Sequence, residues 1–566
     1  MTGTANGDET LNEPDPILPE AEITSPETNY PLWLKLAGVG GLVVVLLIYA
    51  MRMNRVFGLF VDDAWYVLLA KALATGQGYS VINSPSPGIL PLYPPAYPFL
   101  LSLIYRLSPQ FPENIVLLKW LSVAAMMGSG VLTYWYFTRH RKLTPVVAWL
   151  IAMATMLSPT LVFLATSSLM SECVFMCVFL GAVVASERGV RLREGRQAWI
   201  FLALGAALAS GAFLMRSIGL SLMAALFLYL LKVRLVKQAL AVGLMMAALA
   251  GPWILYSRSR TPTPAQQQEQ GGNIVQPYTQ QFWQRRAGDL ASGTATVKDL
   301  PARVVENILE IGGRDAARIL VTPIFEALVD PAKELQNQQL QAGGQLRWLY
   351  FSFLLAILLI VGFVAAARAE FRLADLAVLF SLGITVLWPW ETFRFVLPLT
   401  PFLIFYLLTS LQTIAGAVTR SAPASRLPRQ VTLAAAALLV ALNLYPQVNF
   451  LLKSSGQTVM DENTWEMTFN EAEQMVQQLQ RTLPQDGVIS STNPAFVHLY
   501  TGHKTVSSGD ASVKWEDWKK IGVRYIARVA VFTDSSSPEE SGYRVVYKSR
   551  RITGFWVVDL GVPTSR

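Results

Sequence analysis

Residues 60–79, "FVDDAWYVLLAKALATGQGY", place two adjacent carboxylates, Asp62 and Asp63, directly after a long apolar segment. An apolar run of roughly 20 residues is long enough to cross the hydrocarbon core of a membrane. Ionisable side chains close to that core are unfavourable unless they are paired or serve a function. The stretch therefore predicts the outer end of a membrane span and the start of a candidate site.

The composition of the whole chain favours a membrane protein. Of its 566 residues, 52% are hydrophobic and only 15% are charged, and the mean hydropathy is +0.38. The hydrophobic fraction and the mean hydropathy exceed what a soluble domain of this length shows, and the charged fraction is lower. The formal net charge of +8 is typical of Lys and Arg gathered in cytoplasmic loops, so we predict membrane lipids and no nucleic acid as partners.

The apolar runs predict a mostly α, polytopic bundle of about eleven transmembrane helices. They lie near residues 33–51, 113–137, 144–163, 168–186, 197–215, 217–231, 236–256, 346–367, 373–388, 395–411 and 430–449. Basic stretches fall in alternate loops, which the positive-inside rule places in the cytoplasm. These stretches are 139–142, 187–196, 232–237, 368–372 and 419–430. Outward-facing segments then include the loops 52–112 and 257–345 and tight turns near 158–167 and 388–394.

The two ends of the chain differ from the apolar middle. Residues 1–31 are acidic and rich in Pro, Thr and Asn, which predicts a disordered cytoplasmic tail. From 32 to 455 we expect the membrane domain, with the outer loop 257–345 as a candidate lid. Residues 456–566 combine a helix-like stretch with four strand-like runs, which predicts a small extracytoplasmic α/β or α+β domain.

Three more charged residues share the outer side with the acidic pair. Glu172 lies at the start of the fourth predicted span, and Glu391 and Arg394 lie in the outer turn "LWPWETFRF". A reaction centre or a substrate pathway would explain acids that meet at one depth. Ordinary loop polarity is the alternative, and Glu391 and Arg394, three residues apart, could form a structural ion pair.

One enzyme superfamily has a similar arrangement of residues. "DDAWYVLLAKALATGQGY" (62–79) with "LPLYPPAYPFLLSLIYRL" (90–107) resembles the C-type glycosyltransferases (GT-C fold), specifically the protein O-mannosyltransferase and lipid A aminoarabinose transferase superfamily. These enzymes use polyprenyl-phosphate sugars. Glu172, Arg216, Glu391 and Arg394 also occupy positions where that superfamily carries such residues. The superfamily often has Asp followed by Glu, whereas this chain has Asp62 followed by Asp63.

The resemblance implies an inverting hexosyl- or pentosyltransferase in the inner (plasma) membrane, acting on its outer face. The acceptor would be a hydroxyl of a glycan, lipid or protein. Asp62 would be the general base, and Asp63 would orient the acceptor or join a metal site, a divalent metal ion being the candidate cofactor. Arg216 or Arg394 would bind the donor phosphate, because a guanidinium matches a phosphate with two parallel hydrogen bonds. Alternatively, Arg216 extends from a helix end to water.

Other residues in the same stretches are secondary candidates. Lys71 follows the acids by about two helical turns and could lower their pKa, or it could be a solvated interfacial lysine. Tyr93 and Tyr97 could line an acceptor groove, although aromatic belts at membrane interfaces explain them equally well. His498 and His503 are expected on the surface of the C-terminal domain, and no histidine pair has metal-binding spacing.

The principal alternative is a transporter or flippase for a lipid-linked or small substrate. Transporters tend to show internal repeats and acids near the membrane midplane, and neither is evident here. A ligase or polymerase of lipid-linked glycans usually relies on a histidine in a large outer loop, and residues 257–345 contain none. The absence of a Walker A or dinucleotide-binding motif argues against an ATP-driven pump or a nucleotide-sugar donor.

Overall fold

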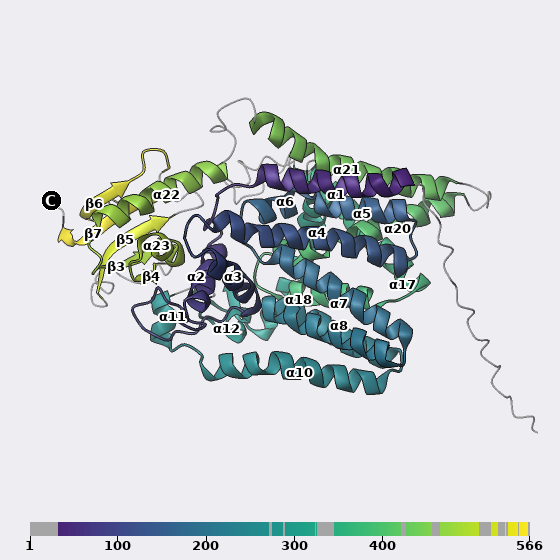
Figure 1. Cartoon of the computed structure of the whole chain (residues 1–566), viewed down its shortest axis with the longest axis horizontal. Helices are drawn as coiled ribbons and strands as arrows, with labels where there is room; N and C mark the ends of the chain where they lie inside the picture. Colours follow the sequence, from purple (N-terminus) through teal and green to yellow (C-terminus); the bar gives the residue numbers. More distant parts are fainter. Residues whose placement is uncertain are drawn as a thin grey trace, which may run out of the picture.

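The computed structural model describes residues 32–270, 274–286, 289–322, 324, 345–419, 426–454, 464–508, 522–529, 538, 542–552 and 554–563. The predicted disordered tail, 1–31, lies outside these residues. Helices of the membrane part lie side by side, and the strands of the C-terminal region gather at one end of them (Figure 1).

Each of the predicted spans falls on helix. Among the described residues, seven helical runs are long and apolar enough to cross a membrane. They are α4 (Ile115–Arg139), α7 (Glu172–Leu192), α8 (Arg196–Met215), α10 (Val236–Ser259), α17 (Gln345–Ala369), α19 (Phe393–Val396) continued through η4 (Leu397–Leu399) and α20 (Thr400–Val418), and α21 (Leu427–Ser454). The chain is a multi-pass membrane protein.

The remaining predicted spans are shorter or bent. Helices α5 (Pro145–Met156) and α6 (Pro159–Thr166) meet at 53° and count as an eighth span if taken together. Three shorter elements occupy the other positions: α1 (Leu32–Arg52), η1 (Ser217–Gly219) with α9 (Leu220–Lys232), and α18 (Leu373–Leu387). The turn expected near 158–167 is instead the helix α6, because Pro159 has the fixed φ that suits a first helical position.

The loop 52–112 carries two helices, α2 (Asp62–Ala74) and α3 (Ala96–Leu107). Val61, directly before α2, has a positive φ of 63°, which is incompatible with right-handed helix and makes the helix begin at Asp62. The two helices pack through aromatic rings, since Tyr66 meets the ring of Tyr97 edge-on at 5.0 Å and that of Tyr93 at 5.4 Å.

The loop 257–345 is largely structured where it is described. It contains α11 (Pro264–Gln270), α12 (Tyr278–Phe282), β1 (Gln284–Arg286), β2 (Asp289–Thr294), η2 (Val297–Asp299), α13 (Leu300–Glu310), the π-helical turn η3 (Ile311–Asp315) and α14 (Ala316–Leu320). Asn307 of α13 donates to the carbonyl of Trp388 at 2.9 Å. This part of the candidate lid is therefore attached to the C-terminal end of α18.

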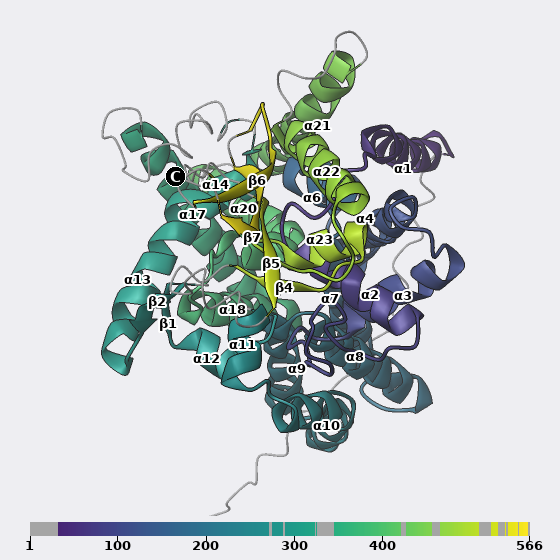
Figure 2. The ribbon, with the colours of Figure 1, turned by 90° about the vertical axis from the view of Figure 1, so that its left-hand side faces the viewer.

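The C-terminal region forms a mixed five-stranded sheet with two helices. Its elements are α22 (Thr464–Thr482), β3 (Val488–Ser491), α23 (Pro494–Thr501), β4 (Thr505–Ser507), β5 (Val523–Val529), β6 (Tyr543–Lys548) and β7 (Phe555–Pro563). The strand order is β4-β3-β5-β7-β6, with β3 parallel to β4 and β5 and with β7 antiparallel to its neighbours. Figure 2 shows this sheet in front of the helical bundle. The predicted helix and all four predicted strands are present.

This C-terminal unit is in contact with the loop 52–112. The side-chain amide of Asn493 donates to the carbonyl of Gly58 at 2.6 Å, and the Phe57 ring lies 6.1 Å from that of Phe496. His498 and His503 are buried, which contradicts their expected surface position. Each has a ring nitrogen near a backbone carbonyl, at 2.7 and 3.0 Å, and this hydrogen bond offsets part of the cost of removing the ring from water. Nδ1 of His503 has no partner among the described residues.

Candidate functional site

Asp62, the first residue of α2, accepts hydrogen bonds on both carboxylate oxygens. The Tyr93 hydroxyl donates to Oδ1 at 2.6 Å, and Nη1 of Arg394 donates to Oδ2 at 3.0 Å. The Asp62 side chain remains 22% exposed and that of Arg394 31%. Residues 332 positions apart in the sequence are thus joined by an ion pair that water can reach.

Glu172, the first residue of α7, is fully buried beside the same arginine. Its Oε1 accepts from Nε of Arg394 at 2.8 Å and from Nη1 of Arg216 at 2.8 Å. Arg216 lies in the extended segment between α8 and η1, and its Nη1 also donates to Ser171 at 3.1 Å. We call Asp62, Tyr93, Glu172, Arg216 and Arg394 the outer cluster, after the side on which the sequence predicts them.

The outer cluster balances two carboxylates against two guanidinium groups. A buried carboxylate without a cation would be strongly unfavourable, so the two arginines stabilise ionised Glu172. Arg394 links both acids through separate nitrogens, which its planar guanidinium allows and a lysine would not. Of the charged residues predicted at one depth, the structure brings Asp62, Glu172 and Arg394 into contact, whereas Asp63 and Glu391 lie outside the cluster.

Two groups of the outer cluster keep unused hydrogen-bonding capacity. Oε2 of Glu172 is buried and has no hydrogen-bond partner among the described residues. Nη2 of Arg394 likewise makes no hydrogen bond within the described part of the chain, and the arginine is partly exposed. An unmade bond to a buried carboxylate oxygen is costly, so this arrangement is suited to a ligand that supplies a donor and accepts from a guanidinium.

Asp63 points away from the outer cluster. It is 1% exposed, its Oδ2 accepts from the Gly58 amide at 2.9 Å, and its Oδ1 accepts from the Ala64 amide at 3.0 Å. Burial raises the pKa of this carboxyl to about 6, with the nearby Asp62 charge acting in the same direction. Asp63 thus stabilises the turn before α2, and the two adjacent acids have different hydrogen-bond partners.

A buried lysine supports the same turn. Lys119 of α4 is 0% exposed and donates through Nζ to the carbonyls of Asn54, Val56 and Thr166 at 2.6–3.0 Å. Its ammonium holds the segment that enters α2 against the start of the bundle. Nothing in the sequence distinguishes this lysine from an interfacial one, because its partners are backbone atoms distant along the chain.

The other candidates lie outside the outer cluster. Glu391 is exposed, and the ion pair considered for it is not formed, since Arg394 binds Asp62 and Glu172 instead. Lys71 is half-buried, and burial lowers its pKa; no contact joins it to either acid. Tyr97 is fully buried and packs on Tyr66, which makes it part of the support of α2.

Two residues of the site region were missed by the sequence analysis. Tyr66 of α2 is buried among the charges of the outer cluster, and burial raises its pKa to about 12. Asp315 of η3 is also buried, its Oδ2 accepts from the Thr392 hydroxyl at 2.5 Å, and burial raises its pKa to about 7. Asp315 attaches the 257–345 loop to Thr392, two residues before Arg394, and no sequence pattern predicts this contact.

Among the described residues, no group of three or more His, Cys, Asp or Glu side chains could hold a metal ion.

Solved structures with the same architecture define the fold class. ArnT from Cupriavidus metallidurans in the apo state is 14% identical, with 93% of this chain and 98% of that chain covered and a TM-score of 0.57. The same protein bound to undecaprenyl phosphate gives 14% identity, the same coverage and a TM-score of 0.54. The chain therefore has the GT-C fold, and the resemblance predicted from the sequence is confirmed at the level of fold.

A second neighbour comes from an archaeon. The oligosaccharyltransferase AglB from Archaeoglobus fulgidus, in complex with an inhibitory peptide and a dolichol-phosphate, is 12% identical, with 88% of this chain and 70% of that chain covered and a TM-score of 0.50. At such identities the likeness establishes the fold alone. No family model matches the sequence, and no curated protein matches it.

Proposed function

We propose that this protein is a membrane glycosyltransferase that moves a sugar from a polyprenyl-phosphate donor to an acceptor hydroxyl at the outer face of the membrane. The observation that carries the proposal is the ion pair between Asp62 and Arg394, with Glu172 and Arg216 on its other side. A general base and phosphate-binding cations are what such a transfer requires. Two of the structural neighbours described above were solved with a polyprenyl phosphate bound.

Arg394 and Arg216 would bind the donor phosphate. Arg394 is the more exposed of the two, and its Nη2 makes no hydrogen bond within the described residues. A phosphate oxygen at this position gains a charge-assisted hydrogen bond without breaking the contact to Glu172. Glu172 would then keep the guanidinium plane fixed while the phosphate is bound.

Asp62 would take the proton from the acceptor. Each of its oxygens accepts from one donor in the absence of substrate, and a carboxylate oxygen can accept two, so Oδ2 has a further lone pair for the acceptor hydroxyl. The acceptor hydroxyl then gives its proton to Oδ2 while its oxygen forms a bond to the anomeric carbon. The bond from that carbon to the phosphate oxygen breaks, and the polyprenyl phosphate leaves with the electron pair, stabilised by the arginines. Attack opposite the leaving group inverts the anomeric centre.

Asp63 would act through the backbone in this scheme. Its hydrogen bonds to the Gly58 and Ala64 amides fix the first turn of α2 and therefore the direction of the Asp62 carboxylate. A role in orienting the acceptor would require the carboxyl to leave this buried position. Transfer measured with and without a chelator tests whether a divalent metal ion is required.

The decisive experiment is transfer by purified protein in proteoliposomes. Wild type and Asp62→Asn are given a panel of polyprenyl-phosphate sugars with glycan, lipid and peptide acceptors, and product is measured by mass spectrometry. We expect transfer by wild type and a loss of at least a hundredfold in Asp62→Asn. Equal rates would refute the base assignment.

The transporter alternative is tested in the same vesicles. A flippase or transporter would move labelled substrate across the bilayer without forming product. Accumulation of intact substrate by both proteins, with no sugar transferred to any acceptor, would overturn the proposed function.

A further inference from the structure

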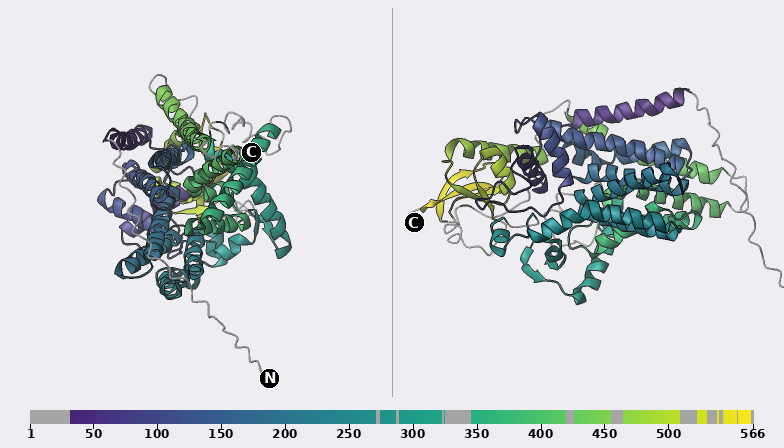
Figure 3. Two further views of the ribbon diagram at one scale, coloured as in Figure 1. Left: turned by 90° about the vertical axis from the view of Figure 1, so that its right-hand side faces the viewer. Right: turned by 60° about the horizontal axis from the view of Figure 1, so that its bottom comes forward.

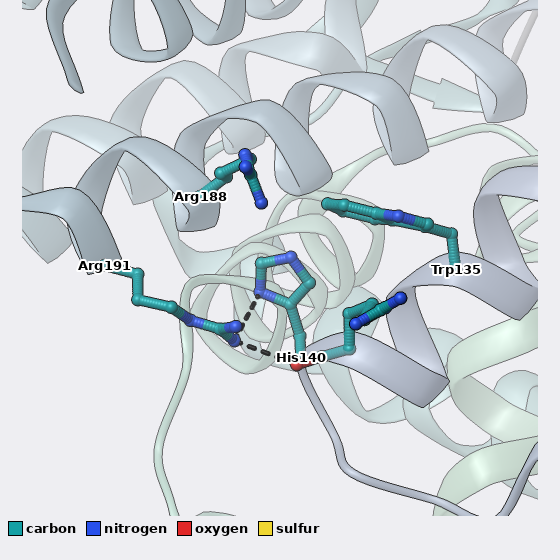
Figure 4. A pocket seen from close by; sticks show the side chains of 5 residues that line it. Trp135, His140, Arg188 and Arg191 are labelled. Carbon is teal, nitrogen blue, oxygen red and sulfur yellow. Dashed lines mark hydrogen bonds between the residues drawn. The ribbon is translucent and has the colours of Figure 1, made fainter. Parts of the chain in front are cut away.

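A basic cavity lies at the end of the bundle opposite the outer cluster. It has a volume of about 430 Å³ and is lined by Trp135 and Arg139 of α4, His140 directly after that helix, and Arg188 and Arg191 of α7 (Figure 4). Glu172 and Arg188 stand on the same helix, about 24 Å apart at 1.5 Å per residue. The right-hand view of Figure 3 shows that this end of the helices is remote from the sheet domain.

The cavity contains a buried polar atom that has no partner among the described residues, Nε2 of His140. His140 is 1% exposed. Figure 4 shows this nitrogen facing the space between Trp135 and Arg188. A buried ring nitrogen without a partner is unfavourable, and a ligand oxygen in the cavity would satisfy it.

The other ring nitrogen fixes the orientation of the imidazole. Nδ1 lies 3.2 Å from Oε2 of Glu187 and 3.4 Å from Nη2 of Arg191, and Arg191 also donates to the Arg139 carbonyl at 3.0 Å. With the ring charged, Nδ1–H donates to Glu187 and Nε2–H points into the cavity. With the ring neutral and Arg191 donating to Nδ1, the proton again lies on Nε2. In both of these states the ring presents a donor to an anion. In the remaining state, a neutral ring whose Nδ1–H donates to Glu187, Nε2 is an acceptor and is suited to a hydroxyl group of the ligand.

The charge of the cavity selects the ligand class. Within the described part of the chain, no carboxylate lies within ion-pair distance of Arg139, Arg188 or Arg191. Three guanidinium groups around one opening are suited to a phosphate, which accepts several charge-assisted hydrogen bonds at once.

The surroundings point to a lipid as the source of that phosphate. The cavity lies at the ends of two membrane-capable helices, where tryptophan commonly marks the membrane interface. Val131, one turn before Trp135 on the same face of α4, is 52% exposed, and it offers an apolar path for acyl chains. Basic pockets between transmembrane helices are typical sites for anionic headgroups. We propose that this cavity binds the phosphate headgroup of an anionic membrane lipid, a property independent of sugar transfer.

Lipid binding by charge-matched variants tests this site. Full-length protein in detergent is titrated with phosphatidylglycerol or phosphatidylcholine, and bound lipid is measured by native mass spectrometry. The pocket variant combines Arg139→Gln with Arg188→Gln, and the control combines Arg193→Gln with Arg196→Gln, which removes the same charge from the adjacent exposed segment. We expect the affinity for phosphatidylglycerol to fall at least tenfold in the pocket variant and less than twofold in the control, with phosphatidylcholine unaffected.

Two outcomes would overturn the inference. Equal loss in both variants would mean that phosphatidylglycerol responds to net charge at this face. Binding of glycerol 3-phosphate without binding of the lipid would mean that the cavity takes a soluble phosphate. If the double variant is poorly folded, Arg188→Gln against Arg196→Gln gives the same comparison, since both side chains are exposed.

Discussion

Two ionic clusters occupy opposite ends of α7, and they differ in what they leave unsatisfied. The outer cluster pairs Glu172, at the first residue of the helix, with two arginines and leaves one carboxylate oxygen without a partner among the described residues. At the other end, Glu187 accepts on both oxygens, from the Tyr136 hydroxyl and the Ala374 amide on Oε1 and from Arg372 on Oε2. The same residue types therefore form an open arrangement at one end and a closed one at the other.

The closed cluster extends to a second buried acid. Asp375 accepts from Arg141 at 2.5 Å and from the Tyr406 hydroxyl at 2.7 Å on Oδ1, and from the Arg372 amide at 2.8 Å on Oδ2. These side chains join α4, α7, α18 and α20. We call Arg141, Glu187, Arg372 and Asp375 the inner cluster. Its role follows from its pairing. Glu187 and Asp375 accept on both oxygens and position helices, whereas the partly exposed Arg394 of the outer cluster is accessible to a ligand.

The largest expected effect is the loss of transfer activity when the outer cluster is altered. Asp62→Asn removes the proton acceptor but preserves the shape of the outer cluster. We expect a loss of about 10²–10⁴-fold in the transfer rate with little change in melting temperature. Glu391→Gln, on the same outer turn but exposed, serves as the control and should transfer at the wild-type rate. A large loss in this control would mean that the site is wider than the outer cluster.

Glu187→Gln should show the opposite behaviour. It removes the shared carboxylate of the inner cluster and leaves Arg372 buried with one acid fewer, so we expect destabilisation of about 3–5 kcal/mol. Thermal unfolding in detergent measures this loss, and the folded fraction should keep its specific activity. A variant of normal stability that fails to transfer sugar would contradict the structural role of the inner cluster.

The pH dependence of stability tests Asp63. Its pKa is raised from 3.8 to about 6, so the folded state binds the proton more tightly than the unfolded state does. The stability contributed by this group is therefore greatest below pH 3.8 and is lost as the pH rises toward 6, by about 3 kcal/mol in total. Melting temperatures measured from pH 4 to 7 should fall more steeply for wild type than for Asp63→Asn. Parallel curves would show that Asp63 does not titrate in this range.

The smallest expected effect concerns the geometry of Arg394. Arg394→Lys keeps the positive charge but cannot contact Asp62 and Glu172 through separate nitrogens while also binding a phosphate. We expect kcat/KM to fall about tenfold, equivalent to about 1.4 kcal/mol, with Lys71→Arg as a control of unchanged activity. Full activity of Arg394→Lys would assign the phosphate to Arg216.

The sequence predicted the helices well because each span needs only its own apolar residues. It also predicted that Asp62, Asp63, Glu172, Glu391 and Arg394 lie on one side, because alternating basic loops indicate the direction of every helix. Asp62, Glu172 and Arg394 are in contact. It failed where burial depends on distant partners. Glu187 and Arg372 were predicted to be charged residues of cytoplasmic loops. In the folded chain they form a buried ion pair between α7 and the start of α18.

The direction of a side chain was equally hidden. Adjacent residues on a helix point about 100° apart, but the sequence does not say which of Asp62 and Asp63 faces the cluster. The positive φ of Val61 and the hydrogen bond from the Gly58 amide to Asp63 determine that Asp62 faces the cluster. His498 and His503 were expected on the surface for a similar reason, because the carbonyls they contact lie on turns that the pattern of strands does not reveal.

Gly58 gives the C-terminal unit a consequence for protein engineering. A Cβ at this position would lie 2.2 Å from the Phe496 ring, and the glycine amide holds Asp63 while its carbonyl accepts from Asn493. Chimeras that graft a foreign tail onto this bundle would leave a hole beside the turn that aims the acidic helix. A chimera that replaces the C-terminal unit should therefore also replace residues 54–61 with the matching segment of the donor protein.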